Sequence, residues 1–285
     1  MRIEVDKRIA AELGEGPIWD AATNELLTVD MISGTVAHTS FAFPAAASSQ
    51  QTVSDYVGAV LPADVPGVVV VTRADLKLAS TNGTKTLVRV IEDTEKRLND
   101  AACDARGRVW VGSTHVDVRE GEGSLHVWEP GGPPAIAAST LTLPNGIGWS
   151  PQNDVIYVAD SGQSSVLRGT FDLESGHIGR LTTLFTVDRG EPDGLCVDAD
   201  GSLWIAIWDG HRVEHRAPDG ELLDTVDLPV TRPTSCALIP GIGLAITTAR
   251  FGLNSETLSE ENAAGHLLIA RSEGNSLPTA RVRTS

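Results

Sequence analysis

The sequence predicts an all-β protein, built as one six-bladed propeller domain over residues 1–285. A pattern of two short apolar strands joined by a turn occurs six times, and successive copies begin 41 to 48 residues apart. Four short strands with their turns need about 40 to 50 residues, which is the length of one propeller blade. No long stretch carries a helical period, apart from a short turn expected within residues 255–262.

Each copy of the repeat opens at an equivalent position, which we call the start position. In most copies a polar residue is followed by a short apolar strand, a turn and a second apolar strand. The four clear copies and the two weaker ones begin, in chain order, at Glu15, Val57, Asn99, Asn145, Asp193 and Thr234. Because the first strand of every blade lines the central channel, we expect the start positions to converge around one axis.

Turn and core residues agree with this repeat. Gly107, Gly201 and Gly220 stand where a tight hairpin needs a positive φ angle. We expect four tryptophans to occupy equivalent strand positions and to pack between blades: Trp19, Trp110, Trp149 and Trp204. A ring of blades must also close, so we expect residues 3–9 to pair with the blade that contains residues 266–270.

Composition excludes several functions. The chain has 22 basic and 38 acidic residues, and its formal charge of −16 would repel a nucleic-acid backbone. The longest apolar runs, such as 68–71, are far shorter than a membrane span, and the N-terminal residues lack the apolar centre of a secretory signal. We therefore expect no nucleic-acid partner, no membrane partner and a cytoplasmic location.

The three cysteines are Cys103, Cys196 and Cys236. They are odd in number, widely spaced and without a histidine at metal-finger spacing, so we expect buried free thiols in a reducing compartment.

Five of the six start positions are polar. Glu15 and Asp193 are carboxylates, while Asn99 and Asn145 offer amide oxygens. Two carboxylates about 5 Å apart repel by roughly 3 kcal/mol at an effective dielectric constant near 20, so either one takes a proton or a cation lies between them. Oxygen ligands favour Ca²⁺, Mg²⁺ or Mn²⁺ over a structural Zn²⁺. The alternative is that polar side chains merely cap strand ends at the channel mouth.

Four ordered blocks resemble the signature of the gluconolactonase, senescence-marker-protein (regucalcin) and luciferin-regenerating-enzyme-like family. They read LGEGPIW at 13–19, RLND at 97–100, LPNGIGWS at 143–150 and PDGLCVD at 192–198. The resemblance implies a propeller that holds one divalent cation, with Glu15, Asn145 and Asp193 matching the metal ligands. Arg97 and Asn99 match the family's substrate-binding residues.

The implied activity is metal-dependent hydrolysis of a sugar lactone, a small-molecule substrate. A divalent cation, Ca²⁺ before Mg²⁺, Mn²⁺ or Zn²⁺, would act as the Lewis acid, and Asp193 would be both metal ligand and general base. The family's acidic substrate contact falls on the loop at 113–119, where this sequence departs from the common pattern and Asp117 is assigned by position only. We expect a monomer or a small homo-oligomer.

Two other interpretations remain open on the sequence. One is a different metal-dependent esterase or a phosphotriesterase on the same scaffold, because a Lewis-acidic cation suits several electrophiles. The other is a non-catalytic calcium-binding propeller module, although a scaffold has no need for polar start positions.

Overall fold

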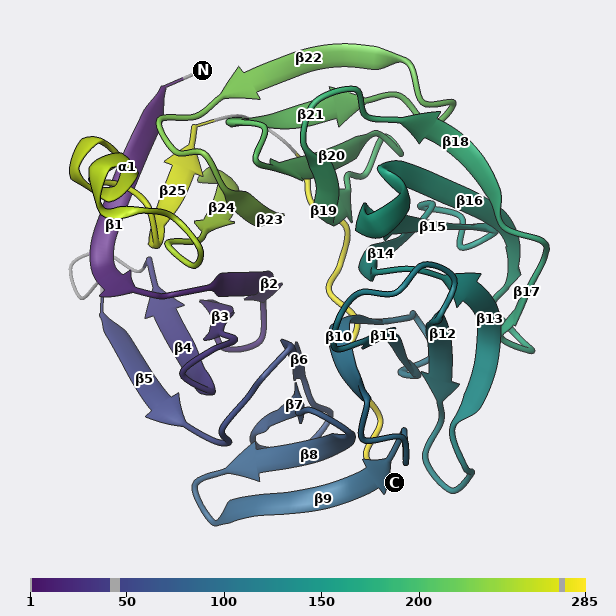
Figure 1. The fold of residues 1–285 in the computed structure, drawn as a ribbon. Helices are drawn as coiled ribbons and strands as arrows, with labels where there is room; N and C mark the ends of the chain where they lie inside the picture. The colour runs from purple at the N-terminus through teal and green to yellow at the C-terminus, as the bar shows by residue number, and fades with distance from the viewer. Residues whose placement is uncertain (1, 42–46, 272–274) are drawn as a thin grey trace.

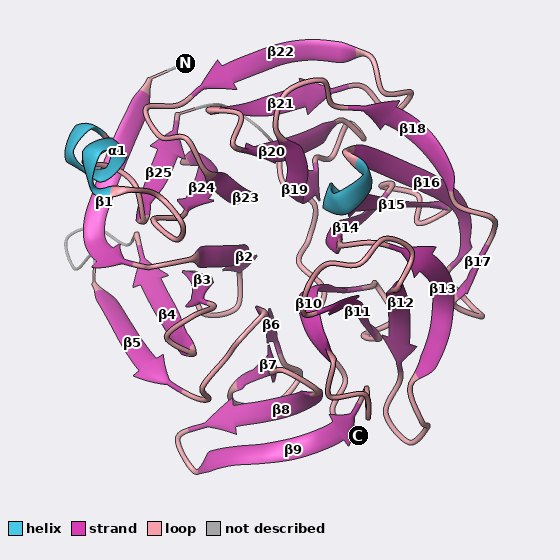
Figure 2. Ribbon diagram, in the orientation of Figure 1, coloured by secondary structure: helices cyan, strands magenta, loops and turns pink. Residues whose placement is uncertain are grey.

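The protein forms six β-sheets arranged as blades around a central axis in the computed structural model (Figure 1). The structure describes residues 2–41, 47–271 and 275–285. The first strand of each blade is innermost, and the later strands lie progressively further out (Figure 2). The predicted six-bladed propeller is therefore confirmed.

Antiparallel pairing joins the strands within each blade. The first three blades contain β2 (Gly14–Asp20), β3 (Glu25–Asp30), β4 (Thr35–Ser40) and β5 (Ser48–Thr52); β6 (Ala59–Pro62), β7 (Val68–Val71), β8 (Asp75–Ser80) and β9 (Gly83–Arg89); and β10 (Lys96–Cys103), β11 (Val109–His115), β12 (Gly123–Trp128) and β13 (Ala135–Leu141). The last three contain β14 (Pro144–Trp149), β15 (Val155–Asp160), β16 (Ser165–Asp172), β17 (His177–Ile178) and β18 (Thr182–Thr186); β19 (Glu191–Val197), β20 (Leu203–Trp208), β21 (Arg212–Arg216) and β22 (Leu222–Asp227); and β23 (Pro233–Ile239), β24 (Gly243–Thr248), β25 (His266–Ala270) and β1 (Ile3–Ala10).

The repeat register is also confirmed. Five start positions lie on innermost strands, and Val57 lies just before β6. Gly107, Gly201 and Gly220 have φ angles of 85°, 89° and 94°, as their hairpin turns require. The helical turn expected within 255–262 is α1 (Ser255–Glu260). No helix in the described ranges has the length and apolarity needed to span a bilayer.

Apolar side chains pack between neighbouring blades and form the core. All four tryptophans of the repeat are buried, and the rings of Trp110 and Trp149 meet edge to face with centroids 6.1 Å apart. Their expected equivalence is wrong, however. Trp19 and Trp149 lie on innermost strands, whereas Trp110 and Trp204 lie on second strands.

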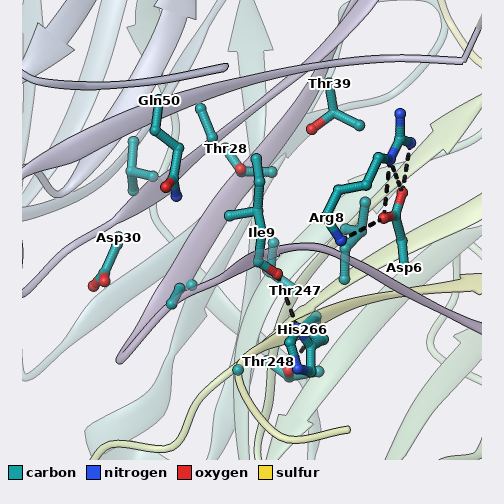
Figure 3. A pocket seen from close by; sticks show the side chains of 16 residues that line it. Asp6, Arg8, Ile9, Thr28, Asp30, Thr39, Gln50, Thr247, Thr248 and His266 are labelled. Atoms are coloured by element: carbon teal, nitrogen blue, oxygen red, sulfur yellow. Dashed lines mark hydrogen bonds and ion pairs between the residues drawn. The ribbon is translucent and has the colours of Figure 1, made fainter. Parts of the chain in front are cut away.

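The N-terminal strand closes the ring as predicted. β1 pairs antiparallel with β25, the outer strand of the blade formed from the other end of the chain. His266 Nδ1 donates a hydrogen bond to the carbonyl oxygen of Ile9 at 2.9 Å, and the Arg8 guanidinium holds the Asp6 carboxylate (Figure 3). Ile3 of β1 also packs against the apolar cluster that contains Leu268 and Ala270.

The C-terminal segment, residues 275–285, makes a second and unpredicted connection across the ring. It passes from the turn after β19 to the turns after β6 and β10, crossing the centre of the propeller (Figure 1). Ser276 bridges to Asp198 and Val282 to Ala63, while Thr279 Oγ1 donates to the carbonyl of Trp19 at 2.6 Å. The segment therefore covers the channel on the face opposite the start positions.

Deletion of residues 1–10 should lower the melting temperature sharply, because it leaves β25 as an unpaired edge and removes Ile3 from the apolar cluster of this blade. Circular dichroism melting curves of the truncated and full-length proteins measure the change. Glu4→Ala, which removes only an exposed ion pair with Arg271, is the control and should melt like the parent. An unchanged melting temperature after deletion would contradict the closing role of β1.

Candidate metal centre and substrate site

β-bulges interrupt the innermost strands at the start positions. The pairing of first and second strands shifts register in five of the six blades, at 15–18, 98–101, 144–147, 192–195 and 233–235. A bulge removes a residue from the regular ladder and redirects its side chain. The polar start residues therefore lie where side chains need not follow the alternating directions of a regular strand.

Two glycines let neighbouring first strands approach each other closely beside these residues. A Cβ atom at Gly146 would lie 2.4 Å from the backbone nitrogen of Leu195, and one at Gly194 would lie 1.9 Å from Ser235 Oγ. No side chain fits at either position. Each glycine follows a start residue, so the same dipeptide that supplies a polar group also brings the next blade close to it.

A chain of hydrogen bonds joins three predicted site residues. Arg97 Nη1 donates to Asn99 Oδ1, and Asn99 Nδ2 donates to Asn145 Oδ1. Asn145 Nδ2 in turn donates to Ser161 Oγ at 2.7 Å. The Ser161 hydroxyl donates to the carbonyl of Pro192 at 2.6 Å, directly before Asp193. This chain fixes the amide orientation of Asn145 and ties it to the strand that carries Asp193.

Two buried acids, Glu15 and Asp193, and the partly buried Asp100 lie close enough to affect one another's protonation. Burial, and after it the charge of Asp100, raise the pKa of Glu15 to about 8. Burial and then the charge of Glu15 hold the pKa of Asp193 well above its ordinary value. Burial also raises the pKa of Asp100 to about 6. The Arg97 guanidinium opposes the first two shifts without cancelling them, so ionising all three acids would leave the site with an excess of negative charge.

Two acidic residues at the ends of second strands bind the backbone of the segments that precede start residues. Asp30 accepts the backbone N–H of Leu13 at 3.2 Å, and Asp160 accepts that of Leu143 at 2.8 Å. Both carboxylates therefore anchor the segment that leads into an innermost strand, just before Glu15 in one blade.

Tyr56 sets the direction of Arg97. Its hydroxyl accepts from Arg97 Nη1 at 2.9 Å and donates to the carbonyl of Leu98 at 2.8 Å. The Arg73 guanidinium lies 5.2 Å from the centre of the same ring. Arg97 is therefore held between Tyr56 and Asn99, which directs it along the wall of the channel mouth.

Asp117 is not part of this network. Its side chain is 71% exposed, and its Oδ2 atom lies 3.6 Å from Arg119 Nη2 and 3.8 Å from His115 Nδ1. Its role in substrate binding therefore stays a prediction.

The sequence pattern did not point to Tyr56, Ser161 or Asp100 as site residues. Tyr56 precedes the weakest copy of the repeat, and Ser161 opens a loop between second and third strands, so neither belongs to the start register. The adjacent polar pair of Asn99 and Asp100 was the one available signal for a third acid.

The predicted ligand set suits a hard divalent cation in its chemistry. Glu15, Asn145 and Asp193 are all buried and offer only oxygen donors, with a negative charge that nearby groups leave uncompensated. Within the described ranges, no cluster of three or more His, Cys, Asp or Glu side chains is placed to hold a metal ion. The metal centre expected from the sequence therefore stays a prediction.

Comparison with known proteins decides the family. The model of the SMP-30/Gluconolactonase/LRE-like region family matches residues 13–250. The chain belongs to this family. The resemblance inferred from the four sequence blocks is thus confirmed.

Individual relatives agree with this assignment. The chain is 30% identical to regucalcin from Gallus gallus over 276 residues, covering 89% of this chain and 88% of that protein. Its fold matches the structure of a luciferin-regenerating enzyme with a TM-score of 0.91 at 25% identity, covering 99% of both chains. It also matches the fold of a calcium-binding protein, regucalcin from Agrobacterium tumefaciens, with a TM-score of 0.92 at 21% identity, covering 98% and 96% of the chains.

The raised pKa of Glu15 predicts how the stability of the metal-free protein depends on pH. The folded state holds a proton on Glu15 up to about pH 8, whereas the unfolded chain releases it near 4.5. Between these values the folded state binds more protons, so the free energy of unfolding falls as pH rises.

Melting curves recorded with a chelator should therefore shift to lower temperature from pH 5 to pH 8. Glu15→Gln should flatten this dependence, whereas Glu260→Gln, on an exposed helix end, should not. An equal slope in the Glu15→Gln variant would show that Glu15 does not carry the effect.

Proposed function

We propose that the protein is a metal-dependent lactonase that hydrolyses a sugar lactone, with one divalent cation held by Glu15, Asn145 and Asp193. The observation that carries this proposal is the burial of two mutually repelling carboxylates, Glu15 and Asp193, from blades far apart in the sequence. Membership of the SMP-30/gluconolactonase family supports the reaction class.

Calcium is the first choice of cation, followed by Mg²⁺, Mn²⁺ and Zn²⁺. The donor set consists of hard oxygen atoms, and a structural neighbour is described as a calcium-binding protein. When bound, the cation would supply Lewis-acid stabilisation of the negative charge that develops on the lactone carbonyl oxygen.

The protein's own side chains would perform the remaining tasks. Asp193 accepts the proton of the attacking water, because a buried carboxylate with a raised pKa is a stronger base than an exposed one. Arg97 and Asn99 orient the substrate through its ring hydroxyls, since the guanidinium presents a fixed fork of donors. Ser161 keeps the Asn145 amide in one orientation.

One observation favours a second candidate function for the same site. Asp117, assigned by position as the acidic sugar contact, is exposed and held by Arg119 rather than joined to the Arg97 network. A substrate without sugar hydroxyls, such as another ester or a phosphotriester, would need no such contact.

Hydrolysis of D-glucono-1,5-lactone, followed by proton release, should require a divalent cation and stop on addition of a chelator. Asp193→Asn should lower kcat/KM by at least about 100-fold, the lower range for loss of a general base. Asp200→Asn, on an exposed turn, is the matched control and should keep full activity. Testing a phosphotriester in parallel separates the two candidates, and full activity of folded Asp193→Asn would overturn the mechanism.

Cation binding should also raise the melting temperature, because the ligand set exists only in the folded state. At one hundred times the dissociation constant the gain is about 2.7 kcal/mol. Asn145→Ala should remove most of this gain, measured by thermal melting across a cation series. If saturating Ca²⁺, Mg²⁺, Mn²⁺ and Zn²⁺ all leave the parent protein unshifted, the metal centre is wrong. A gain without lactonase or esterase turnover would favour the non-catalytic module.

A further inference from the structure

A cavity of about 430 Å³ lies along the channel, between the innermost strands and the C-terminal segment. All three cysteines of the chain, Cys103, Cys196 and Cys236, line it. Asp100 lines this cavity, but none of the proposed metal ligands and substrate-binding residues does, so its thiols serve no step of the proposed reaction.

Two of these thiols form a pair. Cys196 lies on β19 and Cys236 on β23, the innermost strands of neighbouring blades, and their Sγ atoms are 3.9 Å apart. Cys236 Sγ donates to the carbonyl of Trp204 at 3.2 Å. Gly194 packs closely against Ser235, and these residues lie two positions before Cys196 and one position before Cys236, which explains why the two sulfur atoms come so near.

Cys103 provides a natural contrast. It lines the same cavity from blade 3, and its Sγ contacts the carbonyl oxygen of the next residue, Asp104, at 3.5 Å. In the part of the chain that the structure describes, no contact links Cys103 to either of the other cysteines.

We propose that Cys196 and Cys236 are an oxidation site, at which peroxide converts the dithiol into a disulfide that joins blade 5 to blade 6. One thiol sulfur attacks hydrogen peroxide, becoming a sulfenic acid and releasing one water. The second sulfur then attacks the sulfenic sulfur, forming the S–S bond and expelling a second water. The two thiols lose two electrons and two protons in total, and the peroxide is reduced.

The geometry favours this product over further oxidation of a single thiol. A disulfide needs its sulfur atoms about 2 Å apart, so each sulfur must move by only about 1 Å. The resting pair stays reduced, because the hydrogen bond between the two thiols, and then burial, hold the pKa of Cys196 well above its usual range. Oxidation is therefore slow and requires an added oxidant.

The disulfide would affect the stability of the propeller ring. It links residues 40 positions apart and closes a loop that contains the rest of blade 5. A cross-link of this length restricts the unfolded chain and raises the melting temperature. Because Asp193 lies three residues before Cys196 on the same strand, the link also fixes the strand that supplies a proposed ligand.

Treatment of the folded protein with hydrogen peroxide, followed by intact-mass and peptide mass spectrometry, tests the proposal. The parent and Cys103→Ser should each lose the mass of two hydrogen atoms, yield a linked pair of peptides containing residues 196 and 236, and melt at a higher temperature until reductant is added. Cys196→Ser and Cys236→Ser should show neither the linked peptides nor the rise in melting temperature.

The parent protein alone can overturn the inference, independently of any variant's folding. Recovery of three free thiols after peroxide, gain of oxygen atoms without peptide linkage, or a link that involves Cys103 would each contradict it. The outcome does not depend on lactonase activity.

Discussion

Two carboxylates buried at the mouth of one channel impose the constraint on which this structure depends. Glu15 and Asp193 come from blades 1 and 5, and each raises the cost of ionising the other in surroundings that exclude water. Arg97 offsets part of this charge, while Asp100 adds to it. A protein that only needed a stable propeller would place apolar or small residues here, and the proposed cation between these side chains would account for the arrangement.

The repeat places these charged side chains together by means of a short sequence pattern. A polar residue followed by glycine, as at Asn145 and Asp193, provides a buried polar side chain, a bulge and a close contact with the next blade. The ring then has to stay closed for these polar side chains to remain together. β1 secures the outer edge of the last blade, and the C-terminal segment ties four blades together across the opposite face.

Much of the fold follows from the sequence, because one blade is a local pattern and six copies of a blade define a ring. The start positions also predict that Glu15, Asn99, Asn145 and Asp193 face the channel. The path of residues 275–285 has no such signal, since it is held by backbone and side-chain hydrogen bonds to turns rather than by apolar periodicity. Tyr56 and Ser161 lie outside the repeat register and emerge only from three-dimensional contacts.

The central claim is that Glu15, Asn145 and Asp193 bind one divalent cation together. Anomalous diffraction from crystals grown with Mn²⁺ tests it most directly, because the signal locates the ion without reference to activity. One strong peak is expected at the channel mouth, within coordination distance of oxygen atoms from all three side chains. A channel mouth without a peak, or an ion held by other residues, would contradict it.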